Sequence, residues 1–272
     1  MKGSEWEEVL IRATGAVLAK VSPLAKKGGR GRSLGPGASG DVTLYADKVA
    51  EDILVGALAR AGKVRFLSEE AGSFGDPHAE TLAIVDPLDG SSNFERGIPF
   101  YCTSVAIAEG ESLGVMVGVV RDLVSGDVYA AEKGRGATKN GRRIRTSTNE
   151  DPSNAVVGVD LSRSPRGLVS ALAPLVGGVK RQVHLGANAL ELCYLAEGRI
   201  DSFVDLRGRI RVTDFAAANL IAQEAGAVVT DLGGRRLRVA FDLGHRLSFV
   251  ASANPALHGQ VLELCGPPGG GS

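Results

Sequence analysis

Residues 81–95 read TLAIVDPLDGSSNFE, and this stretch decides how the rest of the chain is interpreted. The apolar run TLAIV ends at Asp86, and a second aspartate, Asp89, follows three residues later. A short apolar run that is bounded by turn residues is typical of a buried strand. Because Pro87 fixes its own φ and disfavours a continuing strand, we expect the strand to end at Asp86 and the chain to turn there.

Acidic residues also follow other apolar runs. The run VRFL leads into Glu69 and Glu70, and Asp214 opens the predicted helix TDFAAANLIAQEAG. Strand ends commonly line a cleft in layered α/β folds, and carboxylates gathered there repel one another unless a cation lies between them. Mg²⁺ prefers oxygen ligands and leaves room for a phosphate group. The candidate metal ligands are therefore Glu69, Asp86, Asp89 and Asp214.

Each of these short motifs has an ordinary structural explanation. DPxDG alone is often a surface turn, SEE a solvated acidic face, and Thr-Asp before an apolar run a helix N-cap. Their combination in this order, with each motif next to an apolar run, favours a functional site. If residues 91–93 begin a helical turn, the backbone amides around Gly90 and Ser91 are placed to bind a phosphate.

The flanking sequence divides into two parts. Helical periodicity predicts helices over Glu5–Lys20 and Leu44–Ala61, and later apolar runs predict an antiparallel sheet with a turn near Gly110 and a type I′ hairpin at Asn140-Gly141. After residue 150, strands alternate with helices, one of them over residues 165–176, which indicates an α/β layer. The glycine-rich loop from Lys26 to Gly40 is interpreted either as a lid over the site or as a simple connector.

Composition limits the possible functions. The chain of 272 residues has 31 basic and 31 acidic residues, so no net charge favours nucleic acid or a membrane surface. No signal peptide and no membrane-spanning apolar run is recognised. Three cysteines without CxxC spacing argue against a disulfide framework or zinc site and favour the cytoplasm. The sequence also lacks a G-x-S-x-G nucleophile motif.

The motifs resemble those of the inositol monophosphatase-like, lithium-sensitive phosphatases. The matching segments are SEEAG, DPLDGSSNF, GDVTLYAD, GANALELCYLAEGRIDSFVD and VTDFAAANLIAQEAGAVVTD, which together span roughly residues 40–255. RGIPFY after the DPLDGSSNF motif, and RIRVTD in place of a tryptophan-aspartate pair, make the chain most similar to the archaeal-type enzymes that act on both inositol monophosphate and fructose 1,6-bisphosphate.

The resemblance implies a fold of the α/β (α+β) class, a layered αβαβα sandwich of the sugar-phosphatase type. We expect an N-terminal lobe over residues 1–150 with most metal ligands, a C-terminal lobe over 151–265 with Asp214 and substrate contacts, and a disordered tail over 266–272. It implies two to three Mg²⁺ ions, which Mn²⁺ can replace. Their ligands would be Glu69, Asp86, the Leu88 carbonyl, Asp89 and Asp214, with Asp41 or Asp47 acting through water.

The resemblance also assigns roles in the reaction. Asp47 and Ser91 would activate the attacking water with Glu69, although the family usually has threonine at the position of Ser91. Substrate contacts would come from Gly90, Ser91, Ser92, Gly186, Ala187, Asn188, Asp205, Arg207 and Arg211. With Arg209, the last two arginines form a run that strand alternation would place on one face, where they could bind a second phosphate or simply be solvated.

The expected function is Mg²⁺-dependent hydrolysis of fructose 1,6-bisphosphate, inositol 1-phosphate or both by an activated water. The expected protein is a cytoplasmic homodimer that takes a small phosphorylated sugar or cyclitol and binds neither nucleic acid nor membrane. Two alternatives remain open at this point. One is a nucleotide phosphatase acting on 3′-phosphoadenosine phosphate or NADP, and the other is a family member whose main role is binding a protein or RNA.

Overall fold

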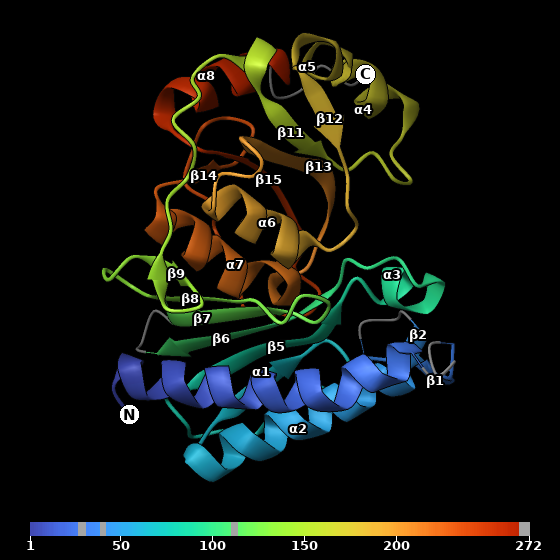
Figure 1. Ribbon diagram of the computed structural model, residues 1–272, viewed down its shortest axis with the longest axis vertical. Coiled ribbons are helices and arrows are strands. Elements are labelled where there is room, and N and C mark those ends of the chain that lie inside the picture. Colours follow the sequence, from blue (N-terminus) through green and yellow to red (C-terminus); the bar gives the residue numbers. More distant parts are fainter. Residues whose placement is uncertain (27–30, 39–41, 110–113, 267–272) are drawn as a thin grey trace.

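The computed structural model describes residues 1–26, 31–38, 42–109 and 114–266. Its elements stack as helices, sheet, helices, sheet and helices along the long axis of the molecule (Figure 1). The expected layered αβαβα sandwich is confirmed. Residues 267–272 of the predicted tail, the turn at Gly110, Asp41 and part of the 26–40 loop lie outside the described residues.

Two helices form the first layer, α1 (Gly3–Lys26) and α2 (Tyr45–Ala61). The buried residues of α1 recur at helical spacing, and they include Trp6, Leu10 and Val17. They pack with α2 against one face of the first sheet and form a continuous apolar core with it. The first helix is longer than predicted and contains Pro23, because the apolar periodicity continues beyond Lys20 to Ala25.

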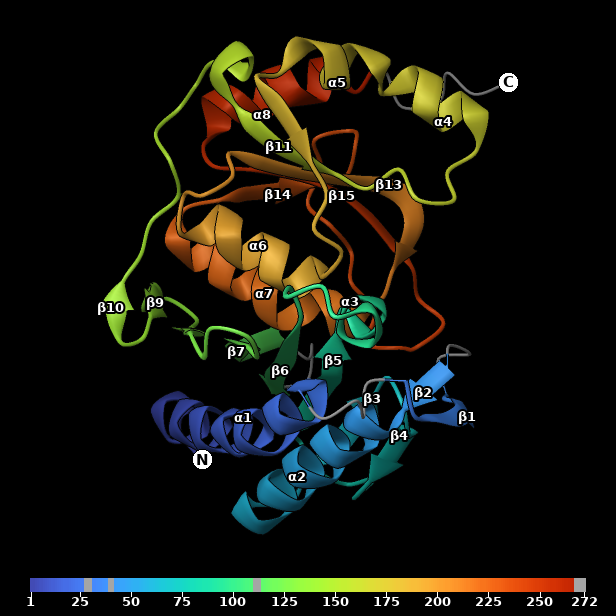
Figure 2. The ribbon, with the colours of Figure 1, turned by 45° about the vertical axis from the view of Figure 1, so that its right-hand side comes forward.

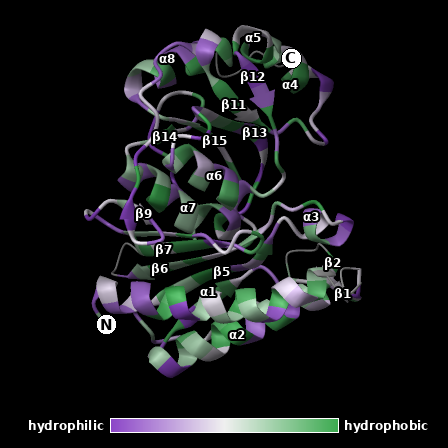
Figure 3. Ribbon diagram, in the orientation of Figure 1, coloured by the Kyte–Doolittle hydropathy of each residue, from purple (hydrophilic) through white to green (hydrophobic). Residues whose placement is uncertain are grey.

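The first sheet has eight strands in the order β10-β9-β8-β7-β6-β5-β3-β4. Their bounds are β3 Arg65–Ser68, β4 Gly72–Gly75, β5 Leu82–Asp89, β6 Cys102–Glu109, β7 Gly114–Asp122, β8 Val128–Glu132, β9 Ala137–Lys139 and β10 Arg142–Arg143. Strands β3 and β5 are parallel and the other pairs are antiparallel. Figure 3 shows the middle strands largely in the hydrophobic colour, as expected for a sheet covered on both faces.

The prediction that the strand ends at Asp86 is wrong, because β5 continues to Asp89 with all eight residues buried. Pro87 is accommodated inside the strand because the pairing with β6 is interrupted there. Asp86 is paired with Ser104 and Asp89 with Cys102, with a register shift between them. A missing N–H is tolerated at such an irregularity. The shift therefore places both aspartates on a distorted strand end rather than on a turn.

The middle layer consists of α6 (Asn188–Ala196) and α7 (Val212–Ala225), which lie between the two sheets (Figure 2). Both helices are apolar on nearly all sides, as expected for helices with a sheet above and below. Helix α7 approaches β7 so closely that a side chain at Gly118 would come within 2.7 Å of the Ala217 carbonyl oxygen. Because α7 packs this closely on the first sheet, Asp214 in the first turn of α7 lies next to that sheet.

The second sheet has five strands in the order β12-β11-β13-β15-β14. These are β11 Val156–Val159, β12 Arg181–Val183, β13 Ser202–Ile210, β14 Val228–Thr230 and β15 Leu247–Ser252. Its far face is covered by α4 (Arg166–Ala171), α5 (Ala173–Gly178) and α8 (Pro255–Leu264). The single helix predicted over residues 165–176 is wrong, because the segment breaks at Leu172 before Pro174, which lacks the N–H of a helix interior.

The smaller elements complete the chain. Strands β1 (Ser33–Pro36) and β2 (Val42–Leu44) form a hairpin beside α2, and η1 (Pro152–Asn154) precedes β11. The type I′ turn is confirmed, since Asn140 and Gly141 both have positive φ, of 52° and 74°. Over the described part of the chain, every helix is too short or too polar to cross a bilayer.

Candidate metal centre and active site

Three carboxylates from three elements meet at the end of the first sheet. Glu69 directly follows β3, Asp86 lies in β5, and Asp214 lies in the first turn of α7. The backbone N–H of Glu69 donates to the Val85 carbonyl oxygen over 3.1 Å, which fixes the end of β3 against β5. One oxygen from each of the three carboxylates lies within 4.8 Å of the other two.

Burial and mutual repulsion disfavour the ionised form of this cluster, and the nearby guanidinium of Arg211 offsets only part of the effect. Desolvation and then mutual repulsion raise the pKa of Glu69 and Asp86 well above their ordinary values, and burial likewise raises the pKa of Asp214. Buried acids at this spacing, all offering oxygen atoms, fit a hard divalent cation such as Mg²⁺. The residues present are therefore able to hold a metal ion.

Asp89 lies beside this cluster, at the start of α6. Its Oδ2 atom accepts a hydrogen bond from the Ala189 backbone N–H over 2.7 Å, and the Cys102 thiol lies 3.7 Å away. Burial and then the charge of Asp214 raise the pKa of Asp89 to about 8, although the backbone amides of α6 oppose the shift. The carboxylate thus connects the cluster to the first turn of α6.

The arginine run is distributed over three environments. Gly208 has φ of +64°, and the pairing of β13 with β15 shifts between Asp205 and Ile210. The expectation that strand alternation places the three arginines on one face is therefore wrong. Nη1 of Arg211 lies 2.6 Å from Oε1 of Glu69, whereas Arg209 is exposed.

Arg207 turns away from the cluster. Its guanidinium donates to both oxygens of Asp205 and pairs with Asp160, with Nη2 2.5 Å from an oxygen of each carboxylate. Asp205, the predicted substrate-hydroxyl ligand, is fully buried in this ion pair. In the structure, Arg207 and Asp205 bind each other.

The predicted water-activating residues lie on two different helices. Asp47 is in the first turn of α2, where its Oδ2 accepts from the Leu44 N–H, and burial raises its pKa to about 7. Ser91 begins α3 (Ser91–Arg96), directly after Gly90, which has φ of +88°. The N–H of Leu88 donates to Oδ1 of Asp86 over 3.0 Å. A carboxylate of the cluster thus fixes the backbone of Leu88, whose carbonyl oxygen is a predicted metal ligand.

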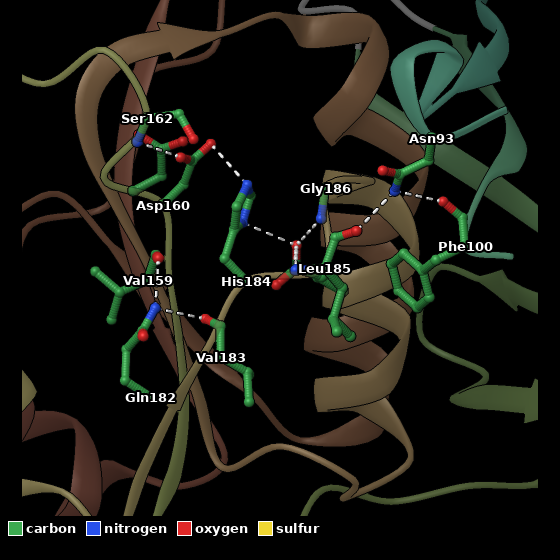
Figure 4. A network of polar contacts seen from close by, with 12 residues as sticks. Asn93, Phe100, Val159, Asp160, Ser162, Gln182, Val183, His184, Leu185 and Gly186 are labelled. Carbon is green, nitrogen blue, oxygen red and sulfur yellow. Dashed lines mark hydrogen bonds and ion pairs between the residues drawn. The ribbon is translucent and has the colours of Figure 1, made fainter. Parts of the chain in front are cut away.

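The predicted phosphate-binding amides lie where α3 meets the start of α6. Ser91 and Ser92 form the first turn of α3, as expected. A Cβ atom at Gly90 would lie 3.1 Å from that of Ala187, so the two segments touch. The Gly186 N–H is already engaged, because it donates to Oε1 of Glu191 over 2.9 Å (Figure 4).

Four residues around this junction were not predicted from the sequence, namely Asn93, Asp160, His184 and Glu191. The Asn93 amide donates to the Phe100 and Leu185 carbonyl oxygens (Figure 4). His184 contacts both Asp160 and Glu191. The available signal was a charged residue, Glu191, within the otherwise apolar segment ALELCYLA. No local pattern indicates that its carboxylate faces a turn instead of solvent.

Comparisons with known proteins agree with this architecture. The inositol monophosphatase family model matches residues 5–266. A fructose-1,6-bisphosphatase/inositol-1-monophosphatase of Thermococcus kodakarensis is 38% identical over 258 residues, which cover 95% of this chain and 96% of the relative. A bifunctional NADP phosphatase/NAD kinase of Methanococcus maripaludis is 31% identical over 254 residues, which cover 85% of this chain and 44% of that protein.

A solved structure extends the similarity to the whole fold. The crystal structure of an inositol monophosphatase-fructose 1,6-bisphosphatase superposes with a TM-score of 0.85 at 30% identity and covers 97% of this chain and 100% of that chain. Family match, relatives and structure therefore agree over nearly the full length, and this chain belongs to the inositol monophosphatase family.

Proposed function

We propose that this protein is a Mg²⁺-dependent phosphomonoesterase that hydrolyses fructose 1,6-bisphosphate and inositol 1-phosphate. The observation that carries the proposal is the cluster of half-buried Glu69 with buried Asp86 and Asp214, with oxygen atoms within 4.8 Å of one another and Asp89 beside it. The dual name of the relatives supports the choice of substrates. Phosphoric monoester hydrolysis is the activity that their names share with the family.

The four carboxylates would hold two ions, together with the Leu88 carbonyl, and a third ion would bind more weakly near Glu69. Bound Mg²⁺ would neutralise the phosphate and lower the pKa of a nearby water, and Mn²⁺ would serve in its place. Asp47 and Ser91 would orient the attacking water. The raised pKa of Asp47, about 7, supports its role as a group that accepts a proton near neutral pH.

The substrate would lie over the junction of the start of α3 with the turn that precedes α6. The first amides of α3, at Ser91 and Ser92, would bind the phosphate, and the adjoining segment from Gly186 to Asn188 would contact the rest of the substrate. Arg211 would approach the phosphate when an ion replaces it at Glu69. Arg207 would contact the substrate, and Asp205, which is fully buried, would act through the guanidinium of Arg207 that it binds.

We assign lobes to residues 1–150 and 151–265, and we propose a cytoplasmic homodimer that binds neither nucleic acid nor membrane. Light scattering on the purified chain would test the dimer, which a monomeric mass would contradict.

The decisive experiment measures phosphate release from both substrates in Mg²⁺ and in EDTA. Metal-dependent release from both would support the dual activity, and release from one alone would restrict the substrate. No release from either would contradict the proposal. NADP should be assayed in parallel, because a bifunctional NADP phosphatase is among the relatives, and release from NADP alone would favour that second candidate.

A further inference from the structure

The turn of residues 184–187, here the Gly186 turn, joins β12 to α6 and lies against the candidate phosphate site. Gly186 has φ of +86°, and a Cβ atom there would lie 3.0 Å from Nδ2 of Asn93. Ala187 lies against Gly90, next to the start of α3. The conformation of this short turn therefore sets the distance between the two helices that flank the site.

Glu191 holds the turn from the side of α6. Its side chain is fully buried, and Oε1 accepts hydrogen bonds from the Leu185 and Gly186 N–H groups over 3.0 and 2.9 Å. His184 adds a contact from Nδ1 to the same oxygen at 3.3 Å. The other oxygen, Oε2, has no hydrogen-bond partner among the described residues. Among the described residues, one oxygen thus makes all the polar contacts of this carboxylate, although burying a carboxylate is costly.

Asn93 holds the turn from the side of α3. Both protons of its amide nitrogen are used, since Nδ2 donates to the Leu185 carbonyl oxygen over 2.7 Å and to the Phe100 carbonyl oxygen over 2.8 Å (Figure 4). Phe100 precedes β6, whose first residue pairs with Asp89. Asn93 therefore ties three segments together: α3, the chain leading into β6 and the Gly186 turn.

The position of the Gly186 turn affects a candidate metal ligand, Asp89, through the first turn of α6. Helix α6 begins directly after the Gly186 turn, and its Ala189 N–H donates to Oδ2 of Asp89 over 2.7 Å. A shift of the turn would therefore move the amide that orients Asp89. Partners that orient a metal ligand commonly affect both ion affinity and activity.

We infer that Glu191 and Asn93 are positioning residues, which clamp the Gly186 turn so that α6 presents its first amides to Asp89 and α3 stays at a fixed distance. The inference rests on the proposed function, but it also concerns ion binding and backbone order, which are measurable without turnover. Both side chains bind backbone groups of the turn and would act through them.

The test compares Glu191→Ala with Glu191→Gln in the full-length protein. Glutamine retains the oxygen that accepts the two N–H groups and replaces the oxygen that has no partner, so it should recover most of what alanine loses. For Glu191→Ala we expect Mn²⁺ affinity, measured by calorimetry, and kcat/KM to fall about 10- to 100-fold. Amide exchange at Leu185, Gly186 and Ala189 should accelerate in parallel.

The matched control is Glu197→Ala, at the other end of α6. Glu197 accepts from the Tyr129 hydroxyl and pairs with Lys139 and Arg199, so it is also an embedded acid on the same helix. Its removal should lower thermal stability but leave Mn²⁺ affinity and exchange at Ala189 unchanged. Equal effects of the two alanine variants on Mn²⁺ affinity would overturn the inference, because they would reflect general loosening of α6.

Asn93→Ala tests the contribution of Asn93 to the clamp, and it replaces Glu191→Ala as the test variant if Glu191→Ala does not fold. It should raise KM and accelerate amide exchange at Leu185. Wild-type KM and exchange in Asn93→Ala, or a Glu191→Gln variant that binds Mn²⁺ no better than the alanine variant, would overturn the inference. If the wild-type protein releases no phosphate from any substrate, the proposed function fails, while Mn²⁺ affinity and amide exchange still decide the role of the clamp.

Discussion

Asp89 combines two roles at the scale of a single residue. It is an acceptor for the start of α6, and it is a charge buried beside Asp214. Asparagine preserves the shape and the acceptor but removes the charge that the candidate metal site requires. We therefore expect Asp89→Asn to fold normally and to lose about 10²- to 10³-fold in kcat.

Phosphate release and thermal unfolding in EDTA would check this expectation. In EDTA the variant should be at least as stable as the wild type, because one member of a repelling pair is gone. Asp231→Asn is a suitable control, since that carboxylate pairs with exposed Arg235 at the surface. Turnover of Asp89→Asn near the wild-type level would contradict the assignment of the metal site.

Arg211 forms an ion pair with a candidate ligand, with Nη1 2.6 Å from Oε1 of Glu69. A guanidinium at this position neutralises part of the acidic cluster and competes with an incoming ion. Arg211→Gln should therefore bind Mn²⁺ more tightly and unfold at a lower temperature in EDTA. Calorimetry would measure the affinity, with Arg209→Gln as the exposed control, and weaker Mn²⁺ binding in Arg211→Gln would contradict a competing role.

At the scale of elements, the Gly186 turn depends on a backbone conformation that other residues rarely adopt. Gly186→Ala would add strain at φ of +86° and place Cβ 3.0 Å from the Asn93 amide. We expect the free energy of unfolding to fall by about 1–3 kcal/mol. Gly167→Ala is the control, because Gly167 lies in α4 with no atom within 4 Å of its Cβ position. Equal stability of the two variants in urea would show that the turn is not strained.

His184, which follows β12, lies close to two carboxylates from other parts of the fold, Asp160 after β11 and Glu191 in α6. Its Nε2 lies 3.4 Å from Asp160 and its Nδ1 3.3 Å from Glu191, while Arg207 faces the same group from β13. Burial alone would lower the pKa of His184, but the hydrogen bond and charge of Glu191, followed by the charge of Asp160, raise it above the ordinary value.

The sign of the pH dependence follows from that shift. The stabilisation by protonated His184 is fully present below the unfolded pKa of about 6.5 and is lost as pH rises through the higher folded value. The unfolding free energy of wild type should exceed that of His184→Gln by about 1 kcal/mol at low pH, and by less at high pH. Denaturation series at several pH values, all in saturating Mg²⁺, would measure both unfolding free energies. A difference between wild type and His184→Gln that stays constant with pH would contradict the prediction.

Elements with a strong local signal could be predicted from the sequence, and those set by tertiary contacts could not. The helix over Tyr45–Ala61 and the hairpin at Asn140-Gly141 were indicated by periodicity and turn residues. The continuation of β5 through Pro87 depends on its neighbour β6, where the register shift removes the need for an N–H. No pattern within residues 81–95 contains that information.

The same distinction applies to the candidate site. Glu69, Asp86 and Asp214 could be proposed as partners because each lies next to an apolar run, and the structure brings them together. The pairing of Arg207 with Asp160 joins residues 47 positions apart and depends on the neighbouring strands β11 and β13. Glu191 was missed for a related reason, because its partners lie in a turn that only tertiary packing defines.

At the scale of the whole molecule, the candidate metal site joins both halves of the chain. Asp86 lies in the first sheet and Glu69 directly follows its strand β3, whereas Asp214 reaches the site from α7, which also packs under the second sheet. Without a metal ion, these acids oppose folding because ionised groups repel in a desolvated site. An ion that binds only the folded state would reverse this effect and tie the layers together.

Thermal unfolding in Mg²⁺ and in EDTA would test this coupling. The stabilisation should grow with ion concentration and reach about 2.7 kcal/mol at 100 times the dissociation constant. Because the pKa of Asp89 is raised to about 8, ion binding near pH 7 should also release protons, which calorimetry in buffers of different ionisation enthalpy detects. Asp214→Asn should lose most of the Mg²⁺ response while remaining folded in EDTA. An unfolding temperature that is the same in Mg²⁺ and EDTA would mean that the acidic cluster binds no ion in the folded protein, and the proposed hydrolysis would then lack its basis.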